Sequence, residues 1–286
     1  MPALVVRVSG PSASVLVDGR ELEVPILPRI PGGPPVAGDD VRLADRGEGQ
    51  LRVEEIHERH TLLSRGEFGS RNRARPLVAN ADLLLVVAAA VDPPFRPRLV
   101  DRYMVAAALG GLEPALAITK LDLVEDRAAL DEQLAVYRDV GYPVEVGSTF
   151  DPAFVERIRG LIGGRIAALA GHSGVGKSSL TQALTGVHRA VGEVSRKVGK
   201  GRHTTSDPRL IPMPGGGAVV DTAGVRTFYL PPMDAEDLGD GFPEIAAAAK
   251  DCRFRGCRHA GEPGCAVAER VHPDRLDSYR RLLDTV

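Results

Sequence analysis

The feature that most constrains this chain is the run Gly171-His-Ser-Gly-Val-Gly-Lys177-Ser178, which matches the pattern G-x-x-x-x-G-K-[ST]. The apolar run Ile166–Ala170 precedes it and the helix-compatible stretch Lys177–Thr185 follows it, so the motif stands in a strand–loop–helix setting. Glycines let backbone N–H groups curl around a phosphate chain, and the helix N-terminus adds a favourable partial charge. The pattern predicts a nucleoside triphosphate site in which Lys177 reaches the β- and γ-phosphates and Ser178 binds Mg²⁺.

A second motif, Thr119-Lys120-Leu121-Asp122, directly follows the apolar run Ala115–Ile118. In guanine-nucleotide-binding proteins the [NT]-K-x-D signature reads the base, because the aspartate accepts hydrogen bonds from guanine N1–H and N2–H₂. Adenine offers no matching donors, so Asp122 argues against an ATPase. A surface Lys–Asp pair at a strand end gives the same letters, but beside a phosphate loop the motif favours GTP.

Three further loops fit a GTPase. Asp221 begins a D-x-x-G pattern after the run Ala218–Asp221, which predicts that it holds Mg²⁺ through water and that the Gly224 N–H senses the γ-phosphate. The loop 199–205 offers a threonine for Mg²⁺, and Ser148 fits the loop that closes over guanine. The predicted nucleotide-binding residues are Thr119, Lys120, Leu121, Asp122, Ser148, Gly171, His172, Ser173, Gly174, Val175, Gly176, Lys177, Ser178, Ser179, Asp221 and Gly224, and the predicted Mg²⁺ ligands are Ser178, Thr204, Thr205 and Asp221.

The order of these motifs is unusual. A standard GTPase runs from the phosphate loop through the switch threonine and D-x-x-G to the base-reading and closing loops, whereas here the last two come first. Joining the ends of the segment 77–230 restores the usual cyclic order. The segment alternates apolar runs with helical stretches, which predicts a parallel sheet with helices on both faces. We therefore expect a circularly permuted GTPase domain.

Shorter modules flank this domain. Residues 1–60 contain five short β-type runs separated by Gly/Pro clusters, which predict a small β-barrel of OB-like or SH3-like type. Residues 61–76 have no periodic apolar face and are predicted to be a flexible basic linker. Residues 231–286 form a Cys/His-containing tail with helical ends, which we expect to be a separate small domain.

All three cysteines lie in this tail, in the pattern Cys252-x4-Cys257-x-His259-x5-Cys265. Three thiolates and one imidazole are the donor set of a closed, structural Zn²⁺ site, and the tail has few large apolar residues with which to fold without a metal. The alternative is one disulfide with a free thiol. An odd number of clustered cysteines favours a reducing compartment and hence a cytoplasmic protein.

Charge is uneven along the chain, although its formal net value is only −2. Basic residues outnumber acidic ones five to one in 59–75 and 196–209, and four to one in 250–259. Such arginine-rich runs suit RNA phosphates, and solvated loops are the alternative. The longest apolar run, Leu83–Val91, is too short to span a bilayer, and no signal peptide is evident, so we expect no membrane partner.

These motifs together, TKLD before GHSGVGKSS, then GKGRHTTSD, DTAGVR and a Cys/His tail behind a small barrel, resemble the RsgA/YjeQ family of ribosome small-subunit-dependent GTPases. The resemblance covers essentially the whole chain. It implies an OB-fold N-terminal domain, one zinc ion on the four tail ligands, and action on the small ribosomal subunit and its rRNA during late maturation. It also implies that the subunit stimulates a slow intrinsic hydrolysis of GTP to GDP and phosphate.

Val225 occupies the position where many GTPases have a glutamine that orients the attacking water. We therefore expect slow turnover by the free protein, with Lys177 and His203 as catalytic residues; a solvent-exposed loop histidine is the other interpretation of His203. The competing function is a GTP-dependent regulator or metal-handling protein that acts on a protein partner rather than on rRNA. We expect a monomer, because no extra amphipathic helix requires a partner.

Overall fold

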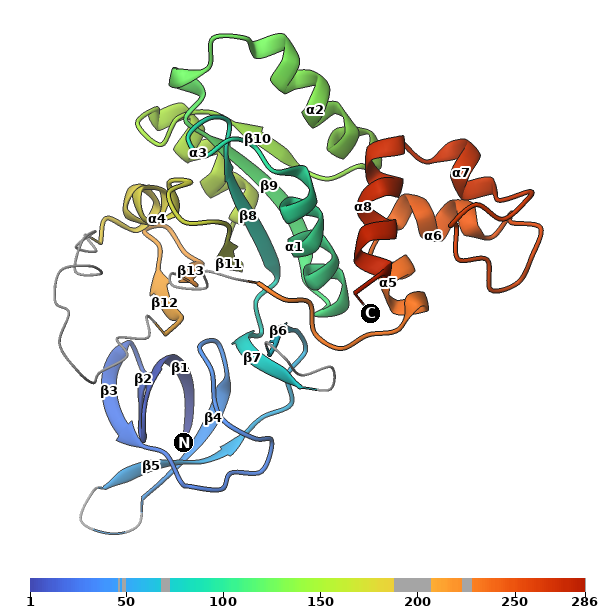
Figure 1. Cartoon of the computed structure of the whole chain (residues 1–286). Helices are drawn as coiled ribbons and strands as arrows, with labels where there is room; N and C mark the ends of the chain where they lie inside the picture. The colour runs from blue at the N-terminus through green and yellow to red at the C-terminus, as the bar shows by residue number, and fades with distance from the viewer. Residues whose placement is uncertain (46, 48–49, 68–72, 188–206, 223–227, 286) are drawn as a thin grey trace, which may run out of the picture.

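The computed structural model describes residues 1–45, 47, 50–67, 73–187, 207–222 and 228–285, and Figure 1 shows how they form three modules. A barrel lies at the N-terminal end, a sheet with helices on both faces lies in the middle, and a helical module lies beside helix α1. No helix of the described residues is long and apolar enough to cross a membrane. The mixed sheet with its N-terminal barrel confirms the predicted fold class.

The barrel is built from the five strands that the sequence predicts. Its strands pair antiparallel in the order β3-β2-β1-β4-β5, and a bridge between Ile26 and Val53 brings the two ends of this order together. Alternate side chains fill its interior, and Val5, Val15 and Val41 are fully buried. This partly open five-stranded barrel is of the OB type. The strands are β1 (Pro2–Ser9), β2 (Ser12–Val17), β3 (Arg20–Pro25), β4 (Asp40–Asp45) and β5 (Leu51–Ile56).

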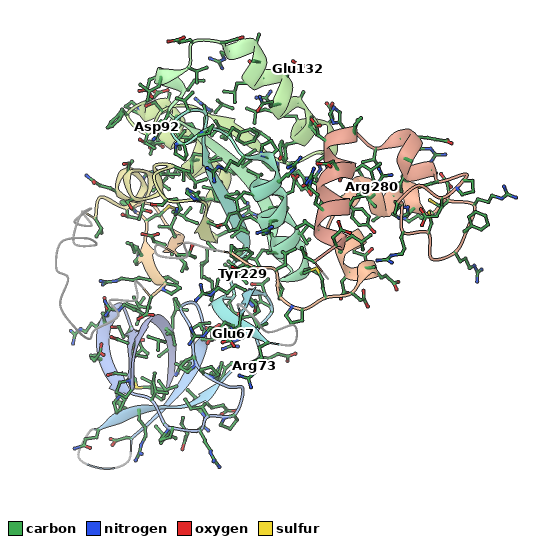
Figure 2. All side chains as sticks on the ribbon, in the orientation of Figure 1. Glu67, Arg73, Asp92, Glu132, Tyr229 and Arg280 are labelled. Atoms are coloured by element: carbon green, nitrogen blue, oxygen red, sulfur yellow. The ribbon has the colours of Figure 1, made fainter. Side chains whose placement is uncertain are left out.

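The segment 61–76 is not the flexible linker that its charge suggested. Strands β6 (Leu62–Gly66) and β7 (Ala74–Ala79) form an antiparallel hairpin over this region. Leu63 and Val78 pair across the hairpin and are buried. Burial of these two apolar side chains stabilises the hairpin despite its exposed arginines. The hairpin also bonds to distant backbone, because Leu62 N–H donates to the Gly110 carbonyl and Gly66 N–H to the Tyr229 carbonyl. Figure 2 shows Glu67, Arg73 and Tyr229 in this region.

The central module has the strand order β10-β9-β8-β11-β13-β12, in which all neighbours are parallel except β13 and β12. One apolar core lies under α1 and α2 and a second under α3 and α4, so helices cover both faces. Every residue of β8 is buried, as expected for an inner parallel strand. The elements are β8 (Leu83–Ala89), α1 (Pro97–Leu109), β9 (Glu113–Thr119), η1 (Leu121–Leu123), α2 (Arg127–Val140), β10 (Val144–Val146), α3 (Pro152–Ile162), β11 (Ile166–Ala170), α4 (Lys177–Thr185), β12 (Arg209–Pro212) and β13 (Ala218–Asp221).

The barrel and the central module share one sheet of eleven strands. Strand β1 pairs antiparallel with β12, with Arg7 opposite Arg209. Arg209 also forms an ion pair with Glu21 of the barrel at 3.2 Å. The barrel is therefore attached to the central module through backbone hydrogen bonds, which the sequence did not indicate.

The C-terminal module consists of four helices around one core. Its apolar residues pack together with Val105 of α1, and Gly241 approaches Val105 so closely that a Cβ there would lie 2.8 Å from the valine side chain. The module therefore rests on α1 of the central module, as Figure 1 shows. Its helices are α5 (Ala235–Asp240), α6 (Pro243–Ala249), α7 (Ala266–Arg270) and α8 (Pro273–Leu283).

A buried arginine joins this module to the centre. Arg275 of α8 is 2% exposed, pairs with Asp101 of α1, and pairs with Glu244 of α6 at 2.6 Å. Its guanidinium also lies 4.6 Å from the centre of the Phe242 ring. The Tyr137 hydroxyl donates to Asp101 at 2.9 Å, so the carboxylate has partners on two sides.

Candidate nucleotide and metal sites

The predicted phosphate loop joins β11 to α4, in the setting that the motif requires. Gly171, Gly174 and Gly176 have φ values of 146°, 81° and 94°, which are unfavourable for other residues. A Cβ on Gly171 would lie 2.0 Å from the Val87 carbonyl oxygen, so the loop leaves the sheet too close to β8 for any side chain. Val175 is buried in the core below and anchors the other end.

Lys177 lies over this loop. Its Nζ donates to the carbonyl oxygens of Gly171 and His172, both at 2.6 Å. Burial lowers the pKa of its ammonium from the usual 10.5 to about 8, and the attraction of Asp221 offsets only part of this effect. The cation is thus poorly solvated and would gain from a phosphate group above the loop.

The rest of the motif surrounds this lysine. Ser178 and Ser179 follow it in the first turn of α4, where Ser178 is half-buried and Ser179 exposed. His172 is half-buried, with Nδ1 3.0 Å from the Ser173 carbonyl oxygen, and Ser173 itself is exposed. The predicted loop residues therefore line one continuous turn at the carboxyl end of β11.

The base-reading motif meets the phosphate loop directly. The Thr119 hydroxyl, fully buried, donates to the Val175 carbonyl at 2.5 Å and lies 3.3 Å from the Ala88 carbonyl. This hydroxyl therefore braces the base-reading loop against the phosphate loop. Two motifs distant in sequence therefore meet at the carboxyl edge of the parallel sheet, where ligands of such folds bind.

The remaining base-reading residues extend along this edge. Lys120 has a left-handed φ of 59°, and its Nζ donates to the Asp92 carbonyl. Leu121 N–H donates to the Gly147 carbonyl at 3.1 Å, which ties the base-reading loop to the predicted closing loop. Asp122 lies exposed in η1, and Ser148 lies half-buried in the closing loop. The Asp122 carboxylate is therefore accessible from solvent.

Asp221 ends β13 and is fully buried. It pairs in register with Leu169 of β11, one residue before the strand leads into the phosphate loop. Thr222 continues this contact, since its hydroxyl donates to the Leu169 carbonyl at 2.6 Å. The predicted residues His203, Thr204, Thr205, Gly224 and Val225 lie outside the described residues.

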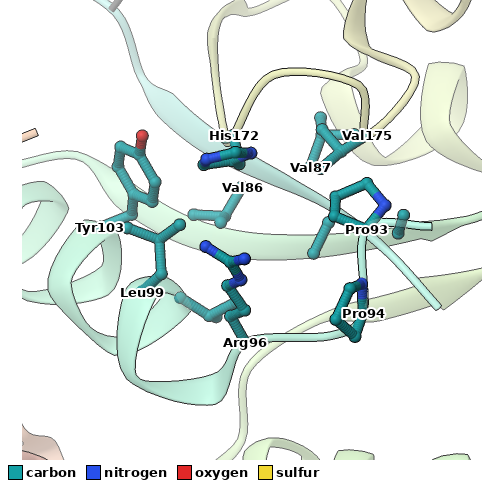
Figure 3. A pocket seen from close by; sticks show the side chains of 13 residues that line it. Val86, Val87, Pro93, Pro94, Arg96, Leu99, Tyr103, His172 and Val175 are labelled. Carbon is teal, nitrogen blue, oxygen red and sulfur yellow. The ribbon is translucent and has the colours of Figure 1, made fainter. Parts of the chain in front are cut away.

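A pocket that the sequence did not indicate borders the phosphate loop. Its walls are the end of β8, the first turns of α1 and the loop residues Gly171, His172 and Val175. Figure 3 shows the Arg96 guanidinium turned toward His172 across the opening, with Tyr103 on the far wall. The first turns of α1 therefore lie next to the phosphate loop.

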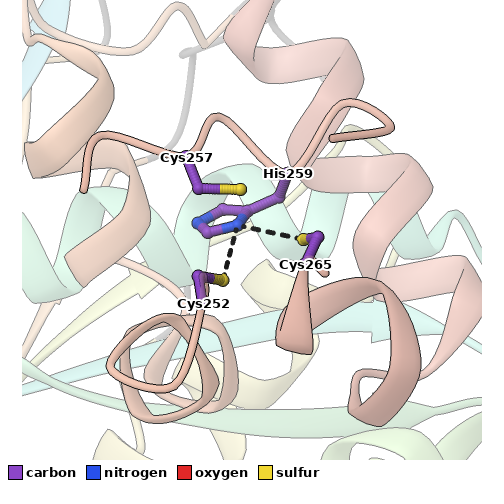
Figure 4. A group of neighbouring side chains, drawn as sticks. All are labelled: Cys252, Cys257, His259 and Cys265. Carbon is purple, nitrogen blue, oxygen red and sulfur yellow. Dashed lines mark hydrogen bonds between the residues drawn. The ribbon is translucent and has the colours of Figure 1, made fainter. Parts of the chain in front are cut away.

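The four predicted metal ligands converge in the C-terminal module (Figure 4). One donor atom from each of Cys252, Cys257, His259 and Cys265 lies within 4.8 Å of all the others. The His259 Nδ1 is 3.7 Å from Cys252 Sγ and 3.5 Å from Cys265 Sγ. A tetrahedral zinc with ordinary bond lengths requires about 3.6 Å between sulfur and nitrogen, so the donors fit this metal. The three cysteines are free thiols, and this cluster can hold a metal ion.

The loop around the cluster is ordered by hydrogen bonds. Burial lowers the pKa of His259, which favours the neutral imidazole that binds metals. The Arg280 guanidinium donates to the His259 carbonyl at 2.7 Å. Backbone N–H groups of Glu262 itself, Arg258 and Ala260 lower the pKa of the Glu262 carboxylate to about 2. Contacts beyond the ligands therefore shape the site.

The basic runs have separate locations. Arg73 and Arg75 are exposed on the β6–β7 hairpin, and Arg255 and Arg258 are exposed on the metal loop. Phe254, between Arg253 and Arg255, is 46% exposed, and the Arg253 guanidinium lies 5.4 Å from its ring centre. Most of the run 196–209 lies outside the described residues.

Comparison with known proteins agrees with this geometry. The family model described as RsgA GTPase matches residues 56–231. A protein of Pseudomonas aeruginosa (strain LESB58), "Small ribosomal subunit biogenesis GTPase RsgA", is 39% identical over 258 residues, which cover 87% of this chain and 75% of that protein. The protein of the same name from Haemophilus influenzae (strain 86-028NP) is 36% identical over 264 residues, covering 88% and 75%.

Solved structures show the same fold. YloQ, described as a circularly permuted GTPase, superposes with a TM-score of 0.73 at 26% identity, covering 99% of this chain and 94% of that chain. YjeQ from Thermotoga maritima superposes with a TM-score of 0.76 at 24% identity, covering 99% and 97%. The superpositions extend over all three modules, which agrees with the permuted order of the motifs.

Proposed function

The chain belongs to the RsgA GTPase family, and from this premise we propose that it hydrolyses GTP to GDP and phosphate on the small ribosomal subunit during late maturation of that subunit. The observation that carries the proposal is the hydrogen bond from Thr119 to Val175, which brings a guanine-reading motif onto a phosphate loop. The curated relatives carry the name of a GTPase of small-subunit biogenesis and share most of the chain. Both lines support the same reaction.

The described residues suggest how the nucleotide is held. Asp122 would accept from the guanine N1–H and N2–H₂, and Lys177 would neutralise charge on the β- and γ-phosphates. Ser178, in the first turn of α4, and the buried Asp221, at the end of β13 beside β11, carry oxygen atoms of the kind that Mg²⁺ prefers. These two residues would hold Mg²⁺, which would supply positive charge to offset that of the phosphates.

The remaining assignments rest on sequence. Gly224 would contact the γ-phosphate, Thr204 or Thr205 would ligate Mg²⁺, and His203 would position the attacking water where Val225 cannot. We further propose that binding to the subunit supplies the arrangement of these residues, so that intrinsic turnover is slow.

We also propose that Cys252, Cys257, His259 and Cys265 bind one structural zinc ion. All four donors belong to the protein and no position is left for a substrate, which is typical of structural rather than catalytic sites. Free thiols agree with a reducing cytoplasm, and we propose a cytoplasmic monomer.

The rRNA of the subunit is the proposed partner of the exposed arginines. Those on the hairpin and on the metal loop present guanidinium groups suited to phosphates. We propose that residues 1–60, 77–230 and 231–286 are the three domains of the chain, with 61–76 in the β6–β7 hairpin between the first two. Binding through such contacts would weaken steeply as salt rises, whereas binding to a protein partner would weaken much less.

The decisive experiment measures GTP turnover with and without isolated small ribosomal subunits. We expect marked stimulation, and the variant Lys177→Ala as a control for contaminating GTPases should lose turnover in both conditions. Equal turnover with and without subunits would contradict the ribosomal partner. Turnover that persists in the control variant would show that this chain is not the source of the activity.

A further inference from the structure

Three consecutive residues of α1 reach three different parts of the molecule. Asp101 pairs with Arg275 of the C-terminal module, and Arg102 Nη1 donates to the Phe228 carbonyl at 3.2 Å. Tyr103 lines the pocket whose opposite wall is the phosphate loop. Successive side chains on a helix point about 100° apart, so one turn of α1 can serve all three contacts.

Tyr103 makes contacts at both ends of its side chain. It is 3% exposed, and its ring centre lies 4.7 Å from that of Phe228, with the planes inclined by 43°. Tyr103 and Gly171, the first residue of the phosphate loop, line the same pocket, and the Gly171 backbone lies near enough to the Tyr103 hydroxyl to lower its pKa by hydrogen bonding. Burial raises the pKa of this hydroxyl to about 12, which Arg102 and the Gly171 backbone offset only in part, so it stays protonated at neutral pH.

Phe228 is the first described residue after the D-x-x-G motif, and it is itself 3% exposed. Its ring is held by Tyr103 and its carbonyl by Arg102. Gly171 and Phe228 therefore adjoin the two segments that contact phosphate in a GTPase, and one tyrosine touches both.

We propose that Tyr103 is a positioning residue for GTP hydrolysis. Its hydroxyl fixes the start of the phosphate loop at Gly171, and its ring fixes Phe228, the first described residue after the D-x-x-G motif. It acts through Gly171 and Phe228 rather than on the nucleotide. The inference rests on the proposed function and adds to it a residue that no motif contains.

Two substitutions separate the two contacts. Tyr103→Phe keeps the ring and removes the hydroxyl, so GDP and a non-hydrolysable GTP analogue should both bind about fivefold more weakly, with their affinity ratio unchanged. Tyr103→Leu also removes the ring contact, so the GTP analogue should lose a further factor of about 3–10 relative to GDP, and kcat should fall. Tyr137→Phe is the matched control, because it removes another buried hydroxyl that faces Asp101 and not the phosphate loop.

The measurement is titration of the full chain with each nucleotide, together with single-turnover hydrolysis. The inference would be overturned if Tyr103→Phe bound GDP as tightly as the wild type, or if Tyr103→Leu kept the wild-type ratio of affinities for the GTP analogue and GDP. It would also be overturned if Tyr137→Phe weakened binding as much as Tyr103→Phe. Tyr103→Phe retains the packing and keeps the test available if the leucine variant does not fold. A wild-type chain that binds neither nucleotide would overturn the proposed function as well, which distinguishes the two failures.

Discussion

The ion cluster around Arg275 gives a prediction whose size follows from burial. The variant Arg275→Met keeps most of the side-chain volume and removes the charge. Asp101 is 2% exposed and would be left without its cation, although the Tyr137 hydroxyl would still donate to it. Glu244 is 17% exposed at its side chain and would recover some solvation. Most of the unfolding free energy lost in Arg275→Met should therefore come from the unpaired Asp101 carboxylate.

The pKa of Asp101 sets the magnitude. Burial already raises it above 3.8, with Arg275 acting against this effect. Without the arginine, the carboxyl group would take up a proton rather than stay buried as an anion. Protonating an ordinary aspartate at about pH 7 costs about 4 kcal/mol, so this is the largest loss of unfolding free energy that Asp101 can cause. The value agrees with the cost of about 3–5 kcal/mol for removing one partner of a buried ion pair.

The sign of the pH dependence is also defined. In Arg275→Met the folded-state pKa of Asp101 lies above its unfolded value, so the destabilisation is complete above the folded-state pKa and disappears below the unfolded one. At about pH 5, about one unit above the ordinary pKa of aspartate, the largest expected loss of unfolding free energy falls to about 1.5 kcal/mol. The double variant Arg275→Met/Asp101→Asn has no buried charge at this position and should recover most of the lost stability at about pH 7.

Urea unfolding at the two pH values measures these differences. The chain has no tryptophan and five tyrosines, and the rings of Tyr137 and Tyr142 lie 5.6 and 5.8 Å from the Arg275 guanidinium, so tyrosine fluorescence reports on the cluster. Arg98→Met is the matched control, because Arg98 also joins α1 to α8 but is 61% exposed. Equal losses in Arg275→Met and the control, or no recovery in the double variant, would refute the reasoning.

Three further predictions concern the two sites. Bound phosphate favours the charged form of Lys177, whose pKa in the free protein is about 8, so GDP binds more weakly once this amine is deprotonated. GDP affinity, measured by titration calorimetry, should therefore fall about tenfold between about pH 7 and about pH 9. The control is Lys177→Arg, which stays charged over this pH range. Its GDP affinity should change with pH only as far as the nucleotide itself titrates. Gly171→Ala should abolish GDP binding, since its Cβ would meet the Val87 carbonyl; retained affinity would show that the loop can move. Cys257→Ser should lower bound zinc, measured by elemental analysis, and expose the C-terminal module to protease; full occupancy would remove Cys257 from the ligand set.

Local patterns were sufficient to predict candidate residues for the two sites. The phosphate loop depends on glycines and a lysine that are adjacent in sequence, and the metal ligands all lie between Cys252 and Cys265. Residues so close along the chain have few possible arrangements, so spacing alone carries the information. The barrel was predicted for a similar reason, because its strands are consecutive in sequence and alternate apolar with polar residues.

The prediction for 61–76 was wrong for the opposite reason. The exposed arginines dominate the composition of this hairpin, whereas its stability comes from the buried pair Leu63 and Val78 and from backbone bonds to Gly110 and Tyr229. No short window of sequence contains those partners.

The sequence by itself determined which groups are the candidates for binding phosphate, guanine and a metal, because each of these motifs is a local arrangement of donors and backbone. Only the tertiary structure decided how the modules are joined. The pairing of Arg7 with Arg209, the burial of Arg275 against Asp101, and the contacts of Tyr103 with Gly171 and Phe228 all link residues far apart in the chain. Neither Arg275 nor Tyr103 stands out in the sequence, because the contribution of each depends on burial. Packing excludes water around the charge and the hydroxyl, and a buried polar group without a partner is costly.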